Sequence, residues 1–233
     1  MKVTEAVVLA GGMGTRLRTI VADRPKPMAE IHGKPFLEYL LDYLAELDIR
    51  KTILSVGYMH ETIVKHFGRR YRNIELDYAI ETTPLGTGGG LRHALFKTRS
   101  EVLFVFNGDT YFRVEPDRMI SMMEEQDADV VLALRSVADS RRYGTIATGT
   151  DSRIVRFSEK GEHHGPALIN GGIYLLKRRT IAEAEFPESF SLETGFFEKK
   201  VSELRFFGIP FTGKFIDIGI PETYTAAGNI LRK

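Results

Sequence analysis

The chain has 233 residues, of which 43% are hydrophobic and 27% charged, and its formal net charge is +1. A balanced charge argues against a protein that attracts nucleic acid through a general basic field, so any phosphate must be bound at a local site. The lack of cysteine excludes disulfides, thiolate catalysis and cysteine-ligated zinc. Without a signal-peptide pattern or a membrane-length apolar run, we expect a cytoplasmic protein.

Segments with strand character alternate with segments of helical periodicity through the first half of the chain. The sequence predicts strands at residues 6–10, 52–56, 74–80, 102–106 and 130–134, and helices at 36–47, 61–67, 88–96 and 116–126. Shorter strands are expected at 145–147, 153–157 and 167–176, with closing helices near 192–201 and 221–231. This order predicts an α/β fold with a mixed, mostly parallel sheet, helices on both faces, and ligands at the carboxyl ends of the strands.

A glycine-rich segment, Leu9-Ala10-Gly11-Gly12-Met13-Gly14-Thr15-Arg16-Leu17, follows the first predicted strand. Three glycines let the backbone turn tightly and bring N–H groups close to phosphate oxygens, and Arg16 adds a planar cation. No Lys-Ser or Lys-Thr pair follows, as a P-loop requires, and Leu17 stands where a dinucleotide fingerprint needs glycine. The segment is therefore a different phosphate-binding loop, or a turn whose glycines serve geometry alone.

A proline-flanked lysine follows in Arg24-Pro25-Lys26-Pro27-Met28. The two prolines stiffen the backbone around Lys26, which suits a phosphate clamp, although a surface turn has the same composition. Together with the glycine-rich segment, this pentapeptide resembles the signature of the sugar nucleotidyltransferase family. Those enzymes join an NTP to a sugar 1-phosphate and release pyrophosphate.

The resemblance implies a Rossmann-like, GT-A-like three-layer sandwich and carries roles to individual residues. Catalytic roles fall to Arg16, Lys26 and Asp109, and nucleotide binding falls to Leu9, Ala10, Gly11, Gly12, Gly14 and Thr15. One departure is visible at Arg18-Thr19-Ile20-Val21, where many members have Pro and Thr. We expect this departure to alter loop conformation and not the chemistry.

Another glycine-rich run follows the third predicted strand, residues 74–80. It extends from Glu81 to Gly90 and reads Glu-Thr-Thr-Pro-Leu-Gly-Thr-Gly-Gly-Gly. Its glycines and Thr87 stand where a helix begins, a natural place to contact an anion or a base. The resemblance assigns nucleotide contacts to Glu81, Pro84, Gly86 and Thr87. Guanine offers two adjacent donors that suit a carboxylate, so Glu81 favours GTP over UTP, unless it is a solvated strand-end glutamate.

Two aspartates adjoin buried runs, Asp109 in Asn107-Gly108-Asp109-Thr110 and Asp217 within residues 215–219. Magnesium prefers one or two carboxylates together with waters and phosphate oxygens. The resemblance therefore assigns a Mg²⁺ cofactor to Asp109 and Asp217, and a nucleotide contact to Gly108. Capping or turn aspartates are the alternative.

Three further segments resemble the sugar side of the family site. They contribute Tyr143, Gly144, Glu159, Lys160, Asn170 and Gly171, which with Asp109 are the expected sugar-phosphate contacts. The resemblance gives Glu159 and Asn170 to sugar hydroxyls and Lys160 to the sugar phosphate. We treat the chain as one domain, with a nucleotide-binding lobe at about 1–135, a sugar-binding lobe at about 136–220 and a helix at about 221–231.

Within the family, the chain is similar to guanylyltransferases of bacterial surface-polysaccharide pathways that use D-glycero-α-D-manno-heptose 1-phosphate. Mannose 1-phosphate is the near alternative, and UTP with glucose 1-phosphate or an N-acetylated sugar 1-phosphate is the further one. A non-catalytic sensor of NDP-sugars is the alternative from another class of protein. The expected partners are an NTP and a sugar 1-phosphate, with no nucleic acid and no membrane, and the sequence leaves room for a homodimer.

Overall fold

The computed structural model describes residues 1–12, 14, 16–17, 20–21, 23–158, 161–162 and 164–232, and one ten-stranded sheet runs through these residues. Its strands are β1 (Glu5–Leu9), β4 (Lys51–Val56), β5 (Arg70–Tyr71), β6 (Ile74–Ile80), β7 (Val102–Asn107), β9 (Val130–Val137), β10 (Thr145–Thr148), β11 (Ile154–Ser158), β12 (Ala167–Lys177) and β13 (Phe206–Phe211). The main path has the order β11-β10-β12-β7-β1-β4-β6-β5, while β9 pairs with β12 and β13 pairs with β9.

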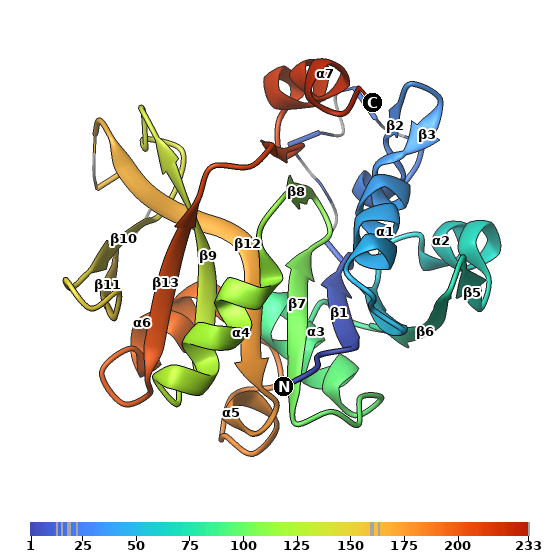
Figure 1. Cartoon of the computed structure of the whole chain (residues 1–233). Coiled ribbons are helices and arrows are strands. Elements are labelled where there is room, and N and C mark those ends of the chain that lie inside the picture. Colours follow the sequence, from blue (N-terminus) through green and yellow to red (C-terminus); the bar gives the residue numbers. More distant parts are fainter. Residues whose placement is uncertain are drawn as a thin grey trace.

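Helices cover both faces of this sheet (Figure 1). They are α1 (Phe36–Glu46), α2 (His60–Phe67), α3 (Gly86–Leu95), α4 (Pro116–Glu125), α5 (Arg179–Ala182), α6 (Glu198–Lys200), α7 (Pro221–Ile230), the 3₁₀-helix η1 (Lys26–Met28) and the π-helix η2 (Leu192–Phe197). Two small ladders complete the described part: β2 (Glu30–Ile31) with β3 (Lys34–Pro35), and β8 (Thr110–Phe112) with β14 (Phe215–Asp217). None of the described helices is long and apolar enough to cross a membrane.

The layers follow from the alternation of side chains along each strand. Val8 and Phe106 pack in the cluster that includes α1, α2 and α4. Their neighbours Val7 and Val105 pack on the opposite face, with α3, α5 and η2. Because both faces are covered, the central strands are apolar at successive positions, as expected for parallel strands.

The central strands are parallel, and their carboxyl ends share one edge of the sheet. β1 pairs in parallel with β4 and β7, and β4 with β6, while β12 runs antiparallel to β7 and β9. Leu9 is level with Ser55 on one side and with Asn107 on the other. The loops after these strands therefore leave the sheet together. This arrangement confirms the predicted α/β class and the mixed central sheet.

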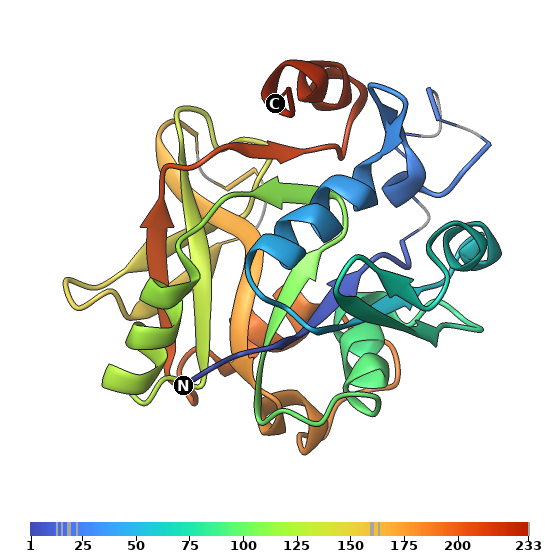
Figure 2. The ribbon, with the colours of Figure 1, turned by 45° about the vertical axis from the view of Figure 1, so that its right-hand side comes forward.

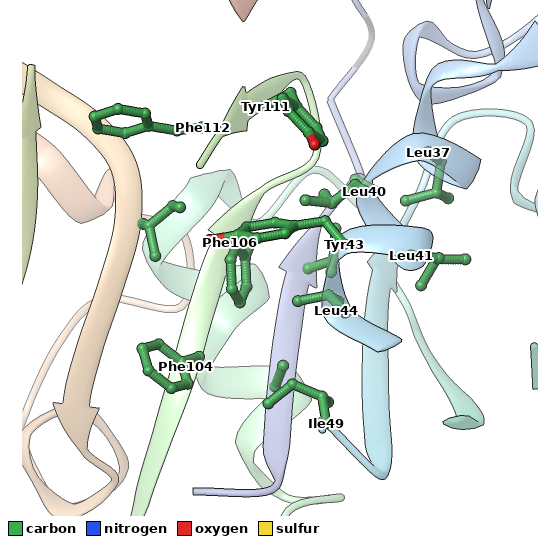
Figure 3. Close-up of a cluster of buried hydrophobic side chains, with 14 of the residues drawn as sticks. Leu37, Leu40, Leu41, Tyr43, Leu44, Ile49, Phe104, Phe106, Tyr111 and Phe112 are labelled. Atoms are coloured by element: carbon green, nitrogen blue, oxygen red, sulfur yellow. The ribbon is translucent and has the colours of Figure 1, made fainter. Parts of the chain in front are cut away.

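Helix α1 anchors this edge through Leu40, Leu44 and Tyr43, which lie on its side toward the aromatic residues of β7, while Leu37 and Leu41 point away from β7 (Figure 3). The Tyr43 ring lies 5.7 Å from the ring of Tyr111, measured between centroids. Its hydroxyl donates to the Val114 carbonyl at 3.1 Å and accepts from the Val114 N–H at 2.9 Å. Burial raises the pKa of Tyr43 to about 12, so the hydroxyl stays protonated. The loop that follows β8 is thereby fixed to α1.

Several elements were not predicted. β13 pairs in parallel with β9, Phe206 opposite Val130, and β14 pairs antiparallel with β8. In Figure 2, β14 (red) lies beside β8 (green) beneath α7. The helix expected at 192–201 begins as the π-helix η2 and continues as α6. The two expected lobes share the one sheet, and the boundaries between them remain a prediction.

Thr52 on β4 offers a test of the core. Its side chain is fully buried, and its hydroxyl has no hydrogen-bond partner within the described residues. Thr52→Val replaces a desolvated hydroxyl by a methyl group of similar size, so we expect the free energy of unfolding in urea to rise by about 1 kcal/mol.

Thr98→Val is the matched control, because the buried Thr98 hydroxyl donates to the Leu95 carbonyl at 2.8 Å. That variant should lose about 1 kcal/mol of unfolding free energy. If Thr52→Val is destabilised as much as Thr98→Val, the Thr52 hydroxyl is not an unsatisfied group.

Candidate active site

Three cavities form one continuous cleft along the carboxyl-terminal edge of the central strands. The Glu81 cavity, about 450 Å³, is lined by Leu9, Gly11, Gly12, Ser55, Gly57, Tyr58, Glu81, Thr82, Thr83, Pro84, Gly86, Thr87 and Gly90. The Lys26 cavity, about 350 Å³, shares Leu9, Gly12 and Thr87 with it and adds Ala10, Gly14, Arg16, Lys26, Pro27, Asn107, Gly108, Asp109, Glu193 and Gly219.

The third, the Tyr143 cavity, has a volume of about 500 Å³. It shares Arg16, Asn107, Asp109, Glu193 and Gly219 with the Lys26 cavity, and its other lining residues include Thr110, Arg142, Tyr143, Gly144, Asn170 and Asp217. The cleft therefore brings together almost every described residue that the sequence singled out.

Four of the residues expected in the site are not found lining the cleft. Gly171 is buried away from the cleft: a Cβ there would lie 2.7 Å from the Ala133 carbonyl oxygen and 2.7 Å from the Phe112 ring. Its position explains the glycine by close packing. Thr15, Glu159 and Lys160 lie outside the described residues.

The glycine-rich loop follows β1 and is held by its neighbours on both sides. The Ala10 N–H donates to the Ser55 carbonyl at 2.8 Å, and the Gly108 N–H donates to the Leu9 carbonyl at 2.9 Å. Gly14 has a φ of +60°, and a Cβ at this residue would lie 2.9 Å from the Lys26 Cβ. Glycine is required here by both backbone conformation and the close approach of Lys26.

Lys26 reaches across the cleft to the end of β7. Its Nζ lies 2.5 Å from Oδ2 of Asp109, and its side chain is 11% exposed. Burial alone would raise the pKa of Asp109. The charge of Lys26 and hydrogen bonds from Lys26 and Thr110 outweigh burial and hold that pKa below its ordinary value. Asp109 is thus an ionised acceptor, with its cation supplied by a segment 83 positions away in the chain.

Asp217 lies beside Asp109 because β14 pairs with β8, which places Asp217 opposite Thr110. The Ile218 N–H also donates to the Asp109 carbonyl at 2.9 Å. The Asp217 carboxylate accepts from the Tyr143 hydroxyl at 2.7 Å and from the Gly219 N–H at 3.0 Å. Burial and then the Asp217 carboxylate raise the pKa of Tyr143, so Tyr143 acts as a donor.

The two aspartates are candidates for a divalent cation. Among the described residues there is no group of three or more His, Cys, Asp or Glu side chains that could hold a metal ion. Within the described residues each carboxylate oxygen of Asp109 and Asp217 has one protein donor, which leaves lone pairs for another ligand. Such a pair suits a cation that takes few protein ligands, as Mg²⁺ does.

Glu81 is held in a fixed orientation at the opposite end of the cleft. Its Oε1 accepts from the Ser55 hydroxyl at 3.1 Å, and its Oε2 accepts from the Leu85 N–H at 3.1 Å. A Cβ on Gly11 or on Gly90 would lie 2.6 Å from Oε1. The glycines therefore make room for this carboxylate, and each of its oxygens retains a lone pair beyond the one described hydrogen bond.

The glycines at the start of α3 serve packing more than ligand binding. The N–H groups of Gly88 and Gly89 both donate to the Phe190 carbonyl, at 2.9 and 3.3 Å. A Cβ on Gly88 would lie 2.2 Å from the Phe190 ring, and one on Gly89 would lie 2.5 Å from the Glu188 carbonyl oxygen. The interpretation that this helix start presents its free N–H groups to an anion is therefore wrong for these two glycines.

The sequence matches the family described as nucleotidyl transferase over residues 5–233. The chain belongs to this family.

Two curated relatives of this nucleotidyl transferase have the same name, D-glycero-alpha-D-manno-heptose 1-phosphate guanylyltransferase. The one from Aneurinibacillus thermoaerophilus is 44% identical over 223 residues, 96% of each chain. The one from Campylobacter jejuni is 39% identical over 220 residues, 94% of this chain and 96% of the relative. The crystal structure of HddC from Yersinia pseudotuberculosis complexed with GMP-PN is 34% identical, with a TM-score of 0.86, and the match covers 98% and 100% of the two chains.

Sequence reasoning missed several lining residues of this nucleotidyl transferase. Ser55 is the penultimate residue of β4 and Asn107 the last residue of β7, and both resemble ordinary polar residues near strand ends. Glu193 lies in the first turn of η2, two positions after the capping Ser191. Acidic residues are common in the first turn of a helix, so a local pattern favours a structural role for it. Only the packing of η2 against α3 brings it to the cleft.

The packing of α3 gives a test. In an open helix, alanine is more favourable than glycine by about 1 kcal/mol. Gly88→Ala nevertheless inserts a methyl group into the space of the Phe190 ring. We expect a net loss of about 2 kcal/mol of unfolding free energy in urea, because overpacking outweighs the helix preference.

Phe190→Ala provides the second arm of a double-mutant cycle. Once the ring is removed, Gly88→Ala should cost far less than in the native chain. Strict additivity of the two losses would mean that Gly88 and Phe190 are not coupled.

Proposed function

We propose that this nucleotidyl transferase condenses GTP with D-glycero-α-D-manno-heptose 1-phosphate to give GDP-heptose and pyrophosphate. The observation that carries the proposal is the 44% identity, over 96% of both chains, to the guanylyltransferase of that specificity. The solved relative HddC, complexed with GMP-PN, supports a guanine nucleotide. GTP is a cytoplasmic metabolite, so the proposal implies activity in the cytoplasm.

The order of the cavities supports a linear arrangement of the two substrates. With the guanine in the Glu81 cavity, the triphosphate extends into the Lys26 cavity, and the sugar 1-phosphate occupies the Tyr143 cavity. The cavities on either side of Asp109 share Arg16 and Gly219, so the two phosphates meet there. An oxygen of the sugar phosphate attacks the α-phosphorus in line, the bond to the β-phosphate oxygen breaks, and pyrophosphate leaves.

The chain contributes charge and position to this step. Arg16, at the exposed junction of two cavities, and Lys26, in the cleft wall, are placed to offset negative charge on the phosphates. The backbone of residues 11–14 can come close to the phosphates because the sequence has a side chain only at residue 13 in this loop. No side-chain nucleophile is required, because transfer between phosphates needs alignment and charge stabilisation.

We also propose that Asp109 and Asp217 hold Mg²⁺. The donor set supports this, since two adjacent carboxylates with free lone pairs are what Mg²⁺ takes alongside phosphate oxygens and water. When bound, the ion would supply positive charge between the two phosphates. Tyr143 and Gly219 would orient the Asp217 carboxylate through the hydrogen bonds described above.

The base preference is proposed to come from Glu81. Its oxygens already accept from Ser55 and from the Leu85 N–H, so the carboxylate cannot rotate to suit another base. A guanine presents N1–H and the N2 amino group side by side, and both can donate to this fixed acceptor. Uracil would place a carbonyl oxygen against the Glu81 carboxylate, which is unfavourable because both groups are hydrogen-bond acceptors.

A substrate panel tests the proposed function. Pyrophosphate release would be measured in Mg²⁺ with GTP, UTP, dTTP, CTP and ATP, each crossed with heptose, mannose, glucose and N-acetylated sugar 1-phosphates. The proposal expects GTP with heptose 1-phosphate to give the highest kcat/KM. Higher kcat/KM with mannose 1-phosphate would change the sugar, and release with UTP alone would overturn the base. Binding of an NDP-sugar without turnover would favour a sensor.

Asp109 gives the sharpest test of the catalytic residues. Asp109→Asn keeps the size of the side chain but removes the charge that faces Lys26 and the proposed cation. We expect kcat to fall by about a thousandfold, the loss typical for a group that stabilises charge in the transition state. Asp117→Asn, at an exposed position on α4, is the control and should keep native activity. Native turnover of Asp109→Asn in Mg²⁺ would contradict the assignment.

Glu81→Gln tests the reading of the base. An amide presents one donor and one acceptor, so it should lose a hydrogen bond to guanine and gain one to uracil. We expect the ratio of kcat/KM for GTP to that for UTP to fall at least tenfold, which corresponds to about 1.4 kcal/mol. Glu75→Gln, at an exposed position of β6, the strand that precedes Glu81, is the control. An unchanged ratio would show that Glu81 does not contact the base.

A further inference from the structure

Glu193 is a carboxylate in the cleft that has no role in the reaction proposed above. It projects from η2 into the junction of the Lys26 and Tyr143 cavities and lines both. Its Oε2 accepts from the Thr87 hydroxyl at 2.9 Å and from the Ser191 hydroxyl at 3.0 Å. Its Oε1 has no protein donor, and the side chain has no cationic partner, within the described part of the chain.

Two hydroxyls, those of Thr87 and Ser191, hold this carboxylate through the same oxygen, Oε2. The Thr87 hydroxyl donates to Glu193 and accepts from the Leu192 N–H at 2.8 Å. The Ser191 hydroxyl accepts from the N–H groups of Glu193 and Thr194, both at 3.2 Å. With Oε2 occupied twice, the remaining oxygen, Oε1, is the one free to meet a ligand.

Electrostatics restricts the kind of ligand. A carboxylate without a cation, in a cleft that receives several phosphates, would repel them at close range. Beside phosphates it needs either a cation, such as the proposed Mg²⁺ or Arg16 of the same two cavities, or a neutral hydrogen-bond donor. Sugar hydroxyls are such donors, and they would enter the cavity that Glu193 shares with Asn170.

A second observation locates Glu193 near the floor of the sugar side. Burial and then the charge of Glu193 raise the pKa of Tyr174. The Tyr174 hydroxyl accepts from the Asn170 amide at 2.7 Å and donates to Asn107 at 3.4 Å. Glu193 lines the Tyr143 cavity and not the Glu81 cavity, which favours a hydroxyl on the sugar side over a group of the base.

We propose that Glu193 is a specificity-determining residue that accepts a hydrogen bond from a ring hydroxyl of the sugar 1-phosphate, and that Thr87 is its positioning residue. This inference rests on the proposed function for the assignment of the sugar to the Tyr143 cavity. It also changes the role of Thr87, which acts on the sugar through Glu193 instead of contacting the nucleotide with its hydroxyl. A π-helix at this position agrees with the frequent use of such turns at functional sites.

Binding of GDP-mannose and of GDP gives the first test, because the difference between them isolates the sugar. Calorimetric Kd values would be measured for the native protein, Glu193→Gln and the control Glu185→Gln, an exposed residue that makes no hydrogen bond or ion pair within the described residues. We expect Glu193→Gln to weaken GDP-mannose about tenfold and GDP less than twofold. Equal weakening of both ligands, or weakening of neither, would overturn the inference. This readout does not need turnover, so it is independent of a failure in the substrate panel.

Deoxygenated substrates identify the hydroxyl. The kcat/KM values of mannose 1-phosphate and its 2-, 3- and 4-deoxy analogues would be compared between the native protein and Glu193→Gln. One deoxy analogue should be poor for the native enzyme yet lose little further in the variant, since the bond is already absent. If the loss in every analogue simply adds to that of the variant, no ring hydroxyl contacts Glu193.

Thr87 is tested by a pair of variants. Thr87→Val removes the donor to Oε2 and the acceptor for the Leu192 N–H, and should raise KM for the sugar 1-phosphate several-fold with little change in KM for GTP. Thr87→Ser retains the hydroxyl and should restore the sugar KM. A KM increase for GTP alone, or no rescue by serine, would contradict the positioning role.

Discussion

The parallel pairing of β1 between β4 and β7 is the constraint on which the site depends. It ends three buried strands at one level, so that loops from distant parts of the chain leave the sheet side by side. The Ala10 N–H and the Gly108 N–H then tie these loops to neighbouring strands. The contact of Lys26 with Asp109 is possible because the loop after β1 returns over the end of β7. The pairing of the Lys26 and Asp109 charges in the cleft is thus a result of strand order.

Much of this could be predicted, since it depends on local composition. Continuous apolar strands such as β1 and β7 reveal their burial on both faces, and the residues after them identify the edge that binds ligand. β13 was missed because Gly208 and Pro210 argue against a strand. Among the described strands β13 forms a ladder with β9 alone, and its other side meets residues 152–153 only at Phe207 and Gly208, so proline is accepted at position 210. The proximity of Lys26 to Asp109 is a tertiary property that neither segment encodes alone.

Glycine shows a second limit of the sequence. Gly14 has a left-handed backbone, and Gly11 leaves room for the Glu81 carboxylate, so both fit the role expected from a binding loop. Gly88 and Gly89 have the same appearance in the sequence, yet they admit the backbone and ring of the 188–190 segment. A glycine-rich segment indicates that another group lies close to its backbone. Whether that is a ligand or another part of the chain depends on a segment about a hundred positions later.

The placement of Asp217 has a consequence for the order in which the parts of the cleft fold. This residue arrives on β14, and the helix after it docks on the N-terminal part of the chain, where the Tyr224 hydroxyl donates to the Glu30 carbonyl at 2.5 Å and His32 meets the Gly228 carbonyl at 2.7 Å. During translation, the glycine-rich loop, Lys26 and Asp109 all leave the ribosome well before Asp217. A nascent chain can therefore have most of its sheet while its second carboxylate is still inside the exit tunnel. The cleft becomes complete only when β14 and α7 fold back over residues that are synthesised earlier.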